Sequence, residues 1–192
     1  IRRSEQQSRN FRIHDEFLKH IDIRPENVHI PDGTISESEV SEYCAAFDKS
    51  IRKIDLMIIG FGEQGQIGFN EQGSYAKSHT RLVELSHNSR KVQSDLFFGL
   101  ENTPKMAITM GIGTIMRADR IVLMAWGEDK ANAVQQIVEG DISDKVPASH
   151  LQAHPNVELV IDENAAEKLT REQTPWLVGP CNWTPKFVRK AV

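Results

Sequence analysis

Residues 55 to 74 read DLMIIGFGEQGQIGFNEQGS, and this stretch decides the fold of the chain. It opens with an uninterrupted apolar run, Leu56 to Gly60, which predicts a fully buried β-strand. Four glycines then lie between positions 60 and 68. In open α/β sheets, ligands bind in loops beyond the carboxyl ends of the strands. The stretch therefore predicts a buried strand that runs directly into a ligand-binding loop.

The rest of the chain alternates between apolar runs of strand length and segments with helical spacing. Predicted strands lie at 28–30, 81–85, 106–110, 120–126 and 157–161, and predicted helices at 6–20, 36–52, 87–98, 129–139, 147–153 and 163–169. Ser36 and Glu39 form a capping-box pattern at the start of the second helix. This alternation predicts an α/β fold with a mostly parallel sheet and helices on both of its faces.

Composition and charge narrow the class of protein. The chain has 192 residues, 39% of them hydrophobic and 26% charged, which is typical of one soluble globular domain. A net charge of −4 gives no electrostatic reason to expect nucleic acid or an anionic membrane surface as a partner. Cys44 and Cys181 have no metal-ligand or disulfide spacing, so we expect reduced thiols in a cytoplasmic protein without metal or cofactor. No apolar run approaches the length of a membrane span.

The amino-acid composition of the chain changes at Thr174. Residues 174 to 192 read TPWLVGPCNWTPKFVRKAV and hold three prolines and two of the three tryptophans. We therefore expect one domain over residues 1–173, followed by a C-terminal segment over residues 174–192. That segment is either a tail packed on the domain surface or the start of a linker to a further domain.

Three segments carry motifs that appear together: DLMIIGFGEQGQIGFNEQGS (55–74), MAITMGIGT (106–114) and LMAWGEDKANAV (123–134). In this order they resemble the glucosamine-6-phosphate deaminase (isomerase) family. The likeness continues through KHIDIRPENVHIPDG, SHTRLVELSHNSRK and SHLQAHPNVELVIDENAAEKL. It covers nearly all of residues 10 to 170, so the ordered set is more specific than any single glycine turn.

The resemblance implies a doubly wound α/β fold of the deaminase/ribose-phosphate isomerase type. Members of the family convert glucosamine 6-phosphate and water to fructose 6-phosphate and ammonia. The resemblance also implies a strand–helix–strand unit, with a phosphate loop and an acidic catalytic residue, before the point where Ile1 aligns. The domain is therefore expected to be N-terminally incomplete, with a central strand left at the edge of the sheet. The tail resembles a subgroup that is fused to a deacetylase-like domain.

The family's chemistry needs a carboxylate base, an imidazole that assists ring opening, and a second carboxylate that orients the imidazole. Gln64 stands where the family's loop has the aspartate, Gln66 stands where it has the histidine, and Glu71 matches the second carboxylate. An amide forms hydrogen bonds but does not titrate in the working range. Acid–base help is worth about 10²- to 10⁴-fold in rate, so we expect deamination to be severely impaired. Glu63 is a less favoured replacement base.

Substrate-binding residues follow from the same resemblance. Lys130 matches a phosphate-binding lysine, and a cation at the start of a helix suits an anion. Gly65 matches within the first glycine loop. Gly113 and Thr114 belong to a second glycine turn, which is either a place for backbone approach to a ligand or a tight strand-to-helix connection. Asp95 stands where members often carry a phosphate-binding arginine, and its carboxylate would repel phosphate.

Other polar residues in the matched region have a structural and a functional interpretation. The histidines are expected to be surface or packing residues, with His79 and His87 as the candidates for a replacement base. Ser74 and Arg81 match positions that bind an allosteric sugar phosphate in some members, and a structural hydrogen bond explains them equally well.

Three functions remain open at this level. The first is an amino-sugar phosphate deaminase/isomerase with impaired activity, and the second is a non-catalytic sugar-phosphate-binding or regulatory domain. The third is a relative that acts on a different sugar phosphate, as 6-phosphogluconolactonases do. The expected partner is a small-molecule sugar phosphate, and the sequence leaves open a homo-oligomer and a fused C-terminal domain.

Overall fold

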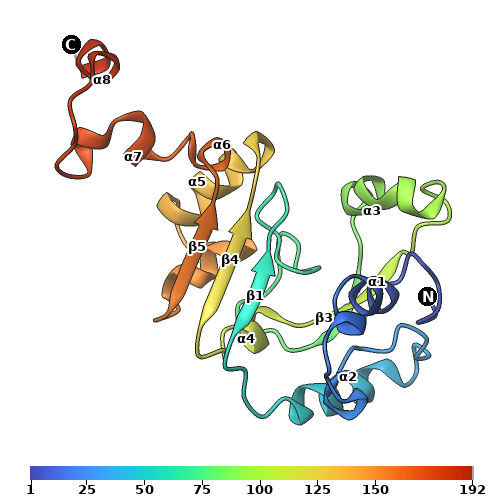
Figure 1. Cartoon of the computed structure of the whole chain (residues 1–192). Helices are drawn as coiled ribbons and strands as arrows, with labels where there is room; N and C mark the ends of the chain where they lie inside the picture. The colour runs from blue at the N-terminus through green and yellow to red at the C-terminus, as the bar shows by residue number, and fades with distance from the viewer. Residues whose placement is uncertain (192) are drawn as a thin grey trace. The chain divides into compact units, whose positions relative to one another are not determined.

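The computed structural model describes residues 1–191 (Figure 1). The chain forms two compact units, which are described separately. The first unit comprises Ile1–Arg52 and His79–Met110, and the second comprises Lys53–Ser78 together with residues 111 to 191. No helix in the described part of the chain is long and apolar enough to cross a membrane.

A parallel three-stranded sheet forms the centre of the second unit. Its strands are β1 (Met57–Gly60), β4 (Ile121–Ala125) and β5 (Val157–Ile161), in the order β1-β4-β5. Their arrows lie side by side and point the same way in Figure 1. Because neighbouring strands are parallel, their carboxyl ends meet at one edge of the sheet. The strands predicted at 56–60, 120–126 and 157–161 are confirmed, and so is the mostly parallel arrangement of this sheet.

One face of this sheet forms the core of the unit. Ile121, Leu123 and Ala125 of β4 are at most 3% exposed. Helix α5 (Ala131–Glu139) contributes a buried stripe at helical spacing, which includes Val134 and Ile137. The 3₁₀ helix η5 (Pro147–Ala153) adds further buried side chains. Each fully buried aliphatic side chain here stabilises the fold by about 1.5–3 kcal/mol relative to an exposed one.

The opposite side of β1 corrects the expectation of a fully buried strand. Ile58 is 64% exposed and the preceding Leu56 is 50% exposed. In β5, Val160 is 37% exposed, and its neighbours Leu159 and Ile161 are half-buried. The reason is position: among the described residues β1 pairs with β4 alone and forms an edge of the sheet. Its apolar run is continuous, but its burial alternates with the pleat.

The first unit contains an antiparallel strand pair. Strands β2 (Arg81–Glu84) and β3 (Met106–Thr109) pair antiparallel, so the predicted strand at 106–110 does not extend the parallel sheet. Between them lie helix α3 (His87–Gln93) and the 3₁₀ helix η3 (Ser94–Phe97). The α-helix predicted over 87–98 is shorter than expected, because the helix changes from α to 3₁₀ geometry at Ser94. The 3₁₀ helix then stops at Phe98, which has a positive φ of 58°.

The N-terminal part of the first unit is less regular than predicted. It contains α1 (Arg9–Glu16), η1 (Leu18–His20), η2 (Pro25–Asn27) and α2 (Val40–Ser50), and residues 28–30 form no strand. Ser8 caps α1, since its hydroxyl accepts a hydrogen bond from the Phe11 N–H at 2.9 Å. The predicted Ser36 cap of α2 is wrong. The Ser36 hydroxyl donates to the Glu39 carboxylate at 2.5 Å, and α2 begins at Val40.

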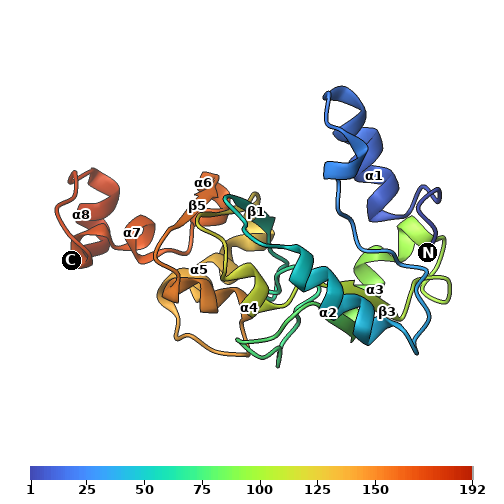
Figure 2. The same cartoon turned by 90° about the horizontal axis from the view of Figure 1, so that it is seen from below.

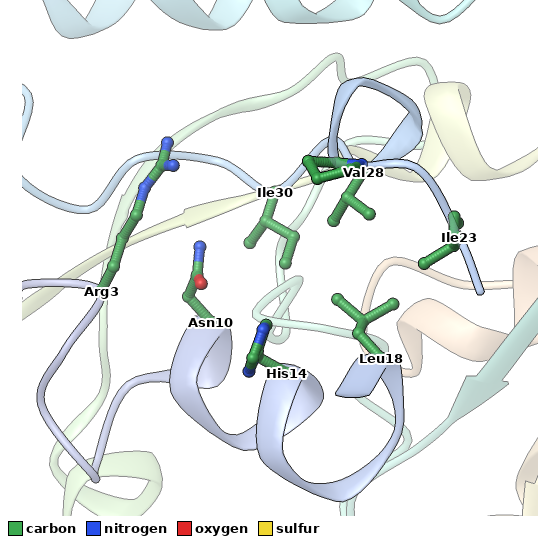
Figure 3. A pocket seen from close by; sticks show the side chains of 8 residues that line it. Arg3, Asn10, His14, Leu18, Ile23, Val28 and Ile30 are labelled. Carbon is green, nitrogen blue, oxygen red and sulfur yellow. The ribbon is translucent and has the colours of Figure 1, made fainter. Parts of the chain in front are cut away.

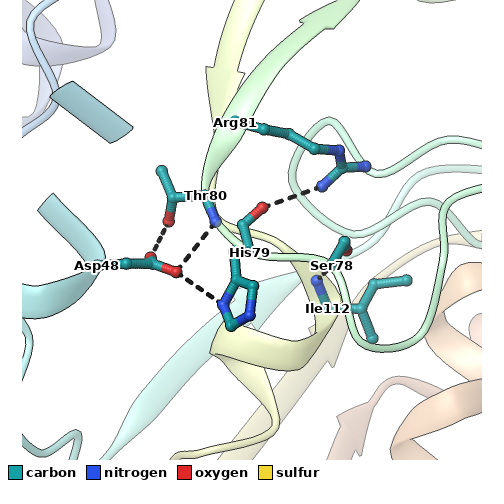
Figure 4. A network of polar contacts seen from close by, with 6 residues as sticks. All are labelled: Asp48, Ser78, His79, Thr80, Arg81 and Ile112. Carbon is teal, nitrogen blue, oxygen red and sulfur yellow. Dashed lines mark hydrogen bonds and ion pairs between the residues drawn. The ribbon is translucent and has the colours of Figure 1, made fainter. Parts of the chain in front are cut away.

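A buried carboxylate joins α2 to β2 (Figure 4). Asp48 accepts hydrogen bonds from the backbone N–H of Thr80 at 3.2 Å and from the Thr80 hydroxyl. Its Oδ2 also lies 3.1 Å from Nδ1 of His79, whose side chain is 74% exposed. One turn earlier in α2, burial raises the pKa of the Cys44 thiol. The network places His79 as a structural partner of Asp48.

Replacing Asp48 with Asn should lower the free energy of unfolding by about 1–3 kcal/mol, because an amide nitrogen then faces a buried donor. Urea denaturation followed by far-ultraviolet circular dichroism measures the change. Asp22→Asn, an exposed site in the same unit, is the matched control. Equal midpoints for the two variants would contradict the structural role of the Asp48 network.

The C-terminal segment forms a local aromatic cluster. It follows α7 (Thr170–Gln173) and contains η6 (Pro175–Leu177) and α8 (Pro185–Ala191). The rings of Trp176 and Trp183 stack with centroids 5.6 Å apart, and Phe187 meets Trp176 edge-on at 6.1 Å. Figure 2 shows α7 and α8 at this end of the chain. The boundary at residue 173 stays a prediction.

Candidate functional site

The glycine-rich loop leaves β1 at the carboxyl edge of the parallel sheet. Two residues anchor it: the side chains of Ile67 and Asn70 are fully buried. The backbone N–H of Asn70 donates to the Ile67 carbonyl at 3.0 Å, and its side-chain nitrogen donates to the same carbonyl at 2.9 Å. Phe61 and Ile67 also form an isolated bridge. The loop is therefore a defined structure with a buried base.

A tight turn from Gly62 to Gln66 carries the two predicted amides. The Gly62 N–H donates to the Gln66 carbonyl at 2.9 Å, and the Gly65 N–H donates to the Gly62 carbonyl at 2.9 Å. The side-chain oxygen of Gln66 accepts a hydrogen bond from the Gln64 backbone N–H at 3.0 Å. The Gln66 carboxamide thus braces the turn that contains it, while the Gln64 side chain is exposed.

The absence of a side chain at Gly62 leaves room for the Gln66 carboxamide in this turn. A Cβ on Gly62 would lie 2.2 Å from both the carboxamide carbon and the nitrogen of Gln66. A larger residue at position 62 would therefore displace the Gln66 side chain.

Gly65 lies where the loop meets a second segment. It has a φ of +72°, which side chains rarely adopt, and a Cβ there would lie 2.5 Å from Cγ1 of Val146. Its carbonyl accepts a hydrogen bond from the Ala148 N–H at 2.8 Å. The backbone of Gly65 is thus used for packing and hydrogen bonding within the protein.

Lys130 lies at the same edge of the sheet as the glycine loop. It ends the 3₁₀ helix η4 (Glu128–Lys130), which follows β4, and its N–H donates to the Gly127 carbonyl at 3.1 Å. The N–H of Gly127 donates to both carboxylate oxygens of Asp162, at 3.1 and 3.2 Å, which fixes the turn. Lys130 is half-buried at the start of α5, where backbone N–H groups favour an anion.

Gly113 and Thr114 lie in α4 (Ile112–Ile115), where Gly113 is half-buried. The Gly113 N–H donates to the Ser78 carbonyl at 2.9 Å. The Ile112 N–H donates to the Ser78 hydroxyl at 3.0 Å, and Figure 4 shows these two residues. A Cβ on Gly113 would lie 2.9 Å from the carbonyl carbon of Lys77. Thr114 is fully buried. These positions explain Gly113 by close backbone packing, and their role in substrate binding stays a prediction.

The remaining predicted groups belong to different elements of the two units. Glu71 is half-buried, and Glu63 is exposed next to Gln64 in the sequence. Asp95 is exposed on η3 in the first unit. Burial lowers the pKa of the Arg81 guanidinium, and this side chain donates to the His79 carbonyl at 3.4 Å. Within residues 1–191, no group of three or more His, Cys, Asp or Glu side chains is placed to hold a metal ion.

A cavity of about 260 Å³ lies within the first unit. Figure 3 shows Asn10 and His14 of α1, with Leu18, facing Val28 and Ile30. Arg3, Ile23 and Pro25 complete its lining. Pockets for small ligands usually measure about 300–1,000 Å³ and hold several convergent polar groups. This one is mostly apolar, and its lining includes none of the predicted site residues.

The sequence of residues 1–161 matches the family described as glucosamine-6-phosphate isomerases/6-phosphogluconolactonase. The chain belongs to this family. A glucosamine-6-phosphate deaminase from Halothermothrix orenii is 41% identical over 166 residues, which cover 85% of this chain and 68% of that protein. A glucosamine-6-phosphate deaminase-like protein from Bacteroides thetaiotaomicron is 44% identical over 183 residues, and the match covers 94% of this chain but only 28% of that protein.

Solved structures show the same fold. A monomeric glucosamine-6-phosphate deaminase of the NagB superfamily matches with a TM-score of 0.83 at 35% identity, over 88% of this chain and 70% of that one. A 6-phosphogluconolactonase from Trypanosoma cruzi matches with a TM-score of 0.64 at 18% identity, a likeness of fold alone. The family and fold expected from the loop motifs are confirmed.

One part of the site was not predicted. Residues 143 to 150 contact the glycine loop at Gly65 and Gly73, and we call them the clasp segment. Nothing in the local sequence pattern pairs these two stretches, which lie far apart along the chain. The sequence marked these two contact points only by the glycines at positions 65 and 73. In the structure both glycines have a positive φ.

Proposed function

We propose that this chain acts in amino-sugar phosphate metabolism as a sugar-phosphate-binding member of the glucosamine-6-phosphate deaminase family. In this proposal, conversion of glucosamine 6-phosphate to fructose 6-phosphate and ammonia is severely slowed. The observation that carries it is the amide pair in the loop. Gln66 replaces the family's imidazole, and its carboxamide is engaged by the Gln64 backbone.

The chemistry of the loop supports the slowed reaction. Moving a proton from C2 to C1 of the sugar requires a group that accepts a proton near neutral pH, and an amide does not. Glu71 keeps the family's second carboxylate without the imidazole that it would orient. Glu63 is adjacent to Gln64, but its side chain is exposed.

The backbone of the site supports retained binding. The loop is anchored by the buried side chains of Ile67 and Asn70, and the turn after β4 is fixed by Asp162. Lys130 supplies a positive charge at the start of a helix, where a phosphate group is stabilised by charge and by backbone N–H donors. Binding without turnover is the expected behaviour of such a site.

The test measures both properties on the same protein. Glucosamine 6-phosphate binding is followed by calorimetry, and ammonia release by a coupled assay. The proposal predicts saturable binding with turnover far below the typical enzymatic value of about 10 s⁻¹. Turnover near that value would overturn the loss of activity and favour Glu63 or Glu71 as the base. Absence of binding to any sugar phosphate would overturn the binding function.

Replacing Lys130 with Ala should weaken glucosamine 6-phosphate binding by about 10- to 100-fold, because one charge-assisted hydrogen bond to phosphate is lost. Calorimetry with the phosphorylated and unphosphorylated sugars measures the effect, which should be confined to the former. Lys53→Ala is the matched control. Lys53 pairs with Asp55 and Asp119 at the amino ends of β1 and β4, the opposite edge of the sheet. Equal weakening by both substitutions would refute a phosphate role for Lys130.

The neighbouring domain, the oligomeric state and the cellular location of this chain stay predictions. A fused C-terminal domain, a homo-oligomer and a cytoplasmic location are all compatible with the described residues. The greater length of the Bacteroides relative supports testing the first of these, by determining the full reading frame that encodes this chain.

A further inference from the structure

The clasp segment, residues 143 to 150, holds the glycine loop at two points. The Ala148 N–H donates to the Gly65 carbonyl at 2.8 Å, and the Gly73 N–H donates to the Asp144 carbonyl at 2.7 Å. Val146 packs against Gly65 between these bonds. The positions of both ends of the loop therefore depend on the conformation of the clasp segment.

The clasp segment is itself closed by side chains. The buried Ser149 hydroxyl accepts a hydrogen bond from the Ser143 N–H at 2.8 Å and donates to the Ser143 carbonyl at 3.2 Å. The Val146 N–H donates to the Ser143 carbonyl at 3.0 Å, which closes a turn. These bonds fix the middle of the segment and the attachment at Gly65.

The attachment at Gly73 is secured differently. Asp144 is the residue whose carbonyl accepts from Gly73, and its side chain is 52% exposed. That carboxylate lies 2.8 Å from Nε2 of His150, whose side chain is only 13% exposed. A mostly buried imidazole thus holds the side chain of a residue that would otherwise rotate freely at the surface. Holding the side chain restricts the backbone of Asp144, including the carbonyl that Gly73 uses.

We propose that His150 is a positioning residue for the glycine-rich loop, acting through Asp144 on Gly73. The Asp144–His150 pair keeps the far end of the loop attached to the clasp segment and so holds the loop in its binding conformation. The effect on ligand affinity rests on the proposed function, whereas the effect on the loop itself does not.

The experiment compares His150→Phe, which keeps a ring but removes the donor, with His150→Gln, which keeps a donor nitrogen at a similar reach. Amide hydrogen exchange of Gly73 and Ala148 is followed in the whole chain by NMR, since these N–H groups report the two attachments separately. In His150→Phe, Gly73 should exchange about 3- to 10-fold faster, as expected for a hydrogen bond weakened locally, with Ala148 unchanged. His150→Gln should restore the slow exchange of Gly73.

Binding gives the second readout. Glucosamine 6-phosphate affinity should fall about 3- to 10-fold in His150→Phe and return in His150→Gln. Unchanged Gly73 exchange in His150→Phe would overturn the proposal, and so would equal acceleration at Gly73 and Ala148, which indicates general unfolding. If the unaltered chain binds no sugar phosphate, the proposed function fails, and the exchange of Gly73 still decides the role of His150.

Discussion

Replacing Gln64 with Asp and Gln66 with His together should raise ammonia release from glucosamine 6-phosphate by about 10²- to 10⁴-fold over the unaltered chain. The two substitutions supply a carboxylate and an imidazole. The loop that holds them is already anchored by the buried side chains of Ile67 and Asn70. Glu71 then regains a group to orient. Steady-state assays at saturating substrate measure the gain.

The matched control keeps both residues as amides. Gln64→Asn with Gln66→Asn changes the same positions but adds no titratable group, and we expect no gain from it. Each single reversion should recover less than the pair, because residues that act as a unit are not additive. A double reversion that binds glucosamine 6-phosphate normally but releases ammonia no faster than the control would show that the amides are not what limits the reaction.

Gly65→Ala should lower the free energy of unfolding by about 2–5 kcal/mol, from a strained backbone and an overpacked contact together. At a φ of +72° an alanine is strained, and its Cβ would lie 2.5 Å from Cγ1 of Val146. Chemical denaturation of the variant and the unaltered chain gives the difference. The same substitution should weaken sugar-phosphate binding, because it displaces the loop from the clasp segment.

Two further variants separate these causes. Gly73 has a φ of +88° and open space around a Cβ, so Gly73→Ala reports the backbone strain alone, about 1–2 kcal/mol. Adding Val146→Ala to Gly65→Ala should recover part of the loss by removing the clash, despite the methyl groups it deletes. If Gly65→Ala costs no more than Gly73→Ala, the contact with Val146 is not tight.

The features of the fold that could be predicted are those that short stretches of sequence determine. The apolar runs at 56–60, 120–126 and 157–161 placed the three strands of the parallel sheet, and the ordered set of motifs along the chain identified the family. The departures at Gln64 and Gln66 could also be seen directly in the sequence. These features depend on residue types at fixed spacing, so no tertiary information was needed.

The features that escaped prediction depend on contacts between distant segments. The sequence predicted a central strand at the edge of the sheet but also a fully buried run at 56–60, so the exposure of Ile58 was missed. The antiparallel pairing of β2 and β3 follows from the return of the chain after α3. The brace made by Gln66 needs the geometry of the turn. The pairing of Gly73 with Asp144 joins loops that no local pattern connects.

The stacked tryptophans of the C-terminal segment affect how the intrinsic tryptophan fluorescence of this protein can be interpreted. Trp176 and Trp183 lie together at the C-terminal end, whereas Trp126 is 56% exposed between β4 and the turn that carries Lys130. Intrinsic fluorescence of the unaltered chain therefore mixes a tail signal with a signal from the sheet edge. With phenylalanine at 176 and 183, Trp126 becomes a single optical probe beside the proposed phosphate position, and it needs no added label.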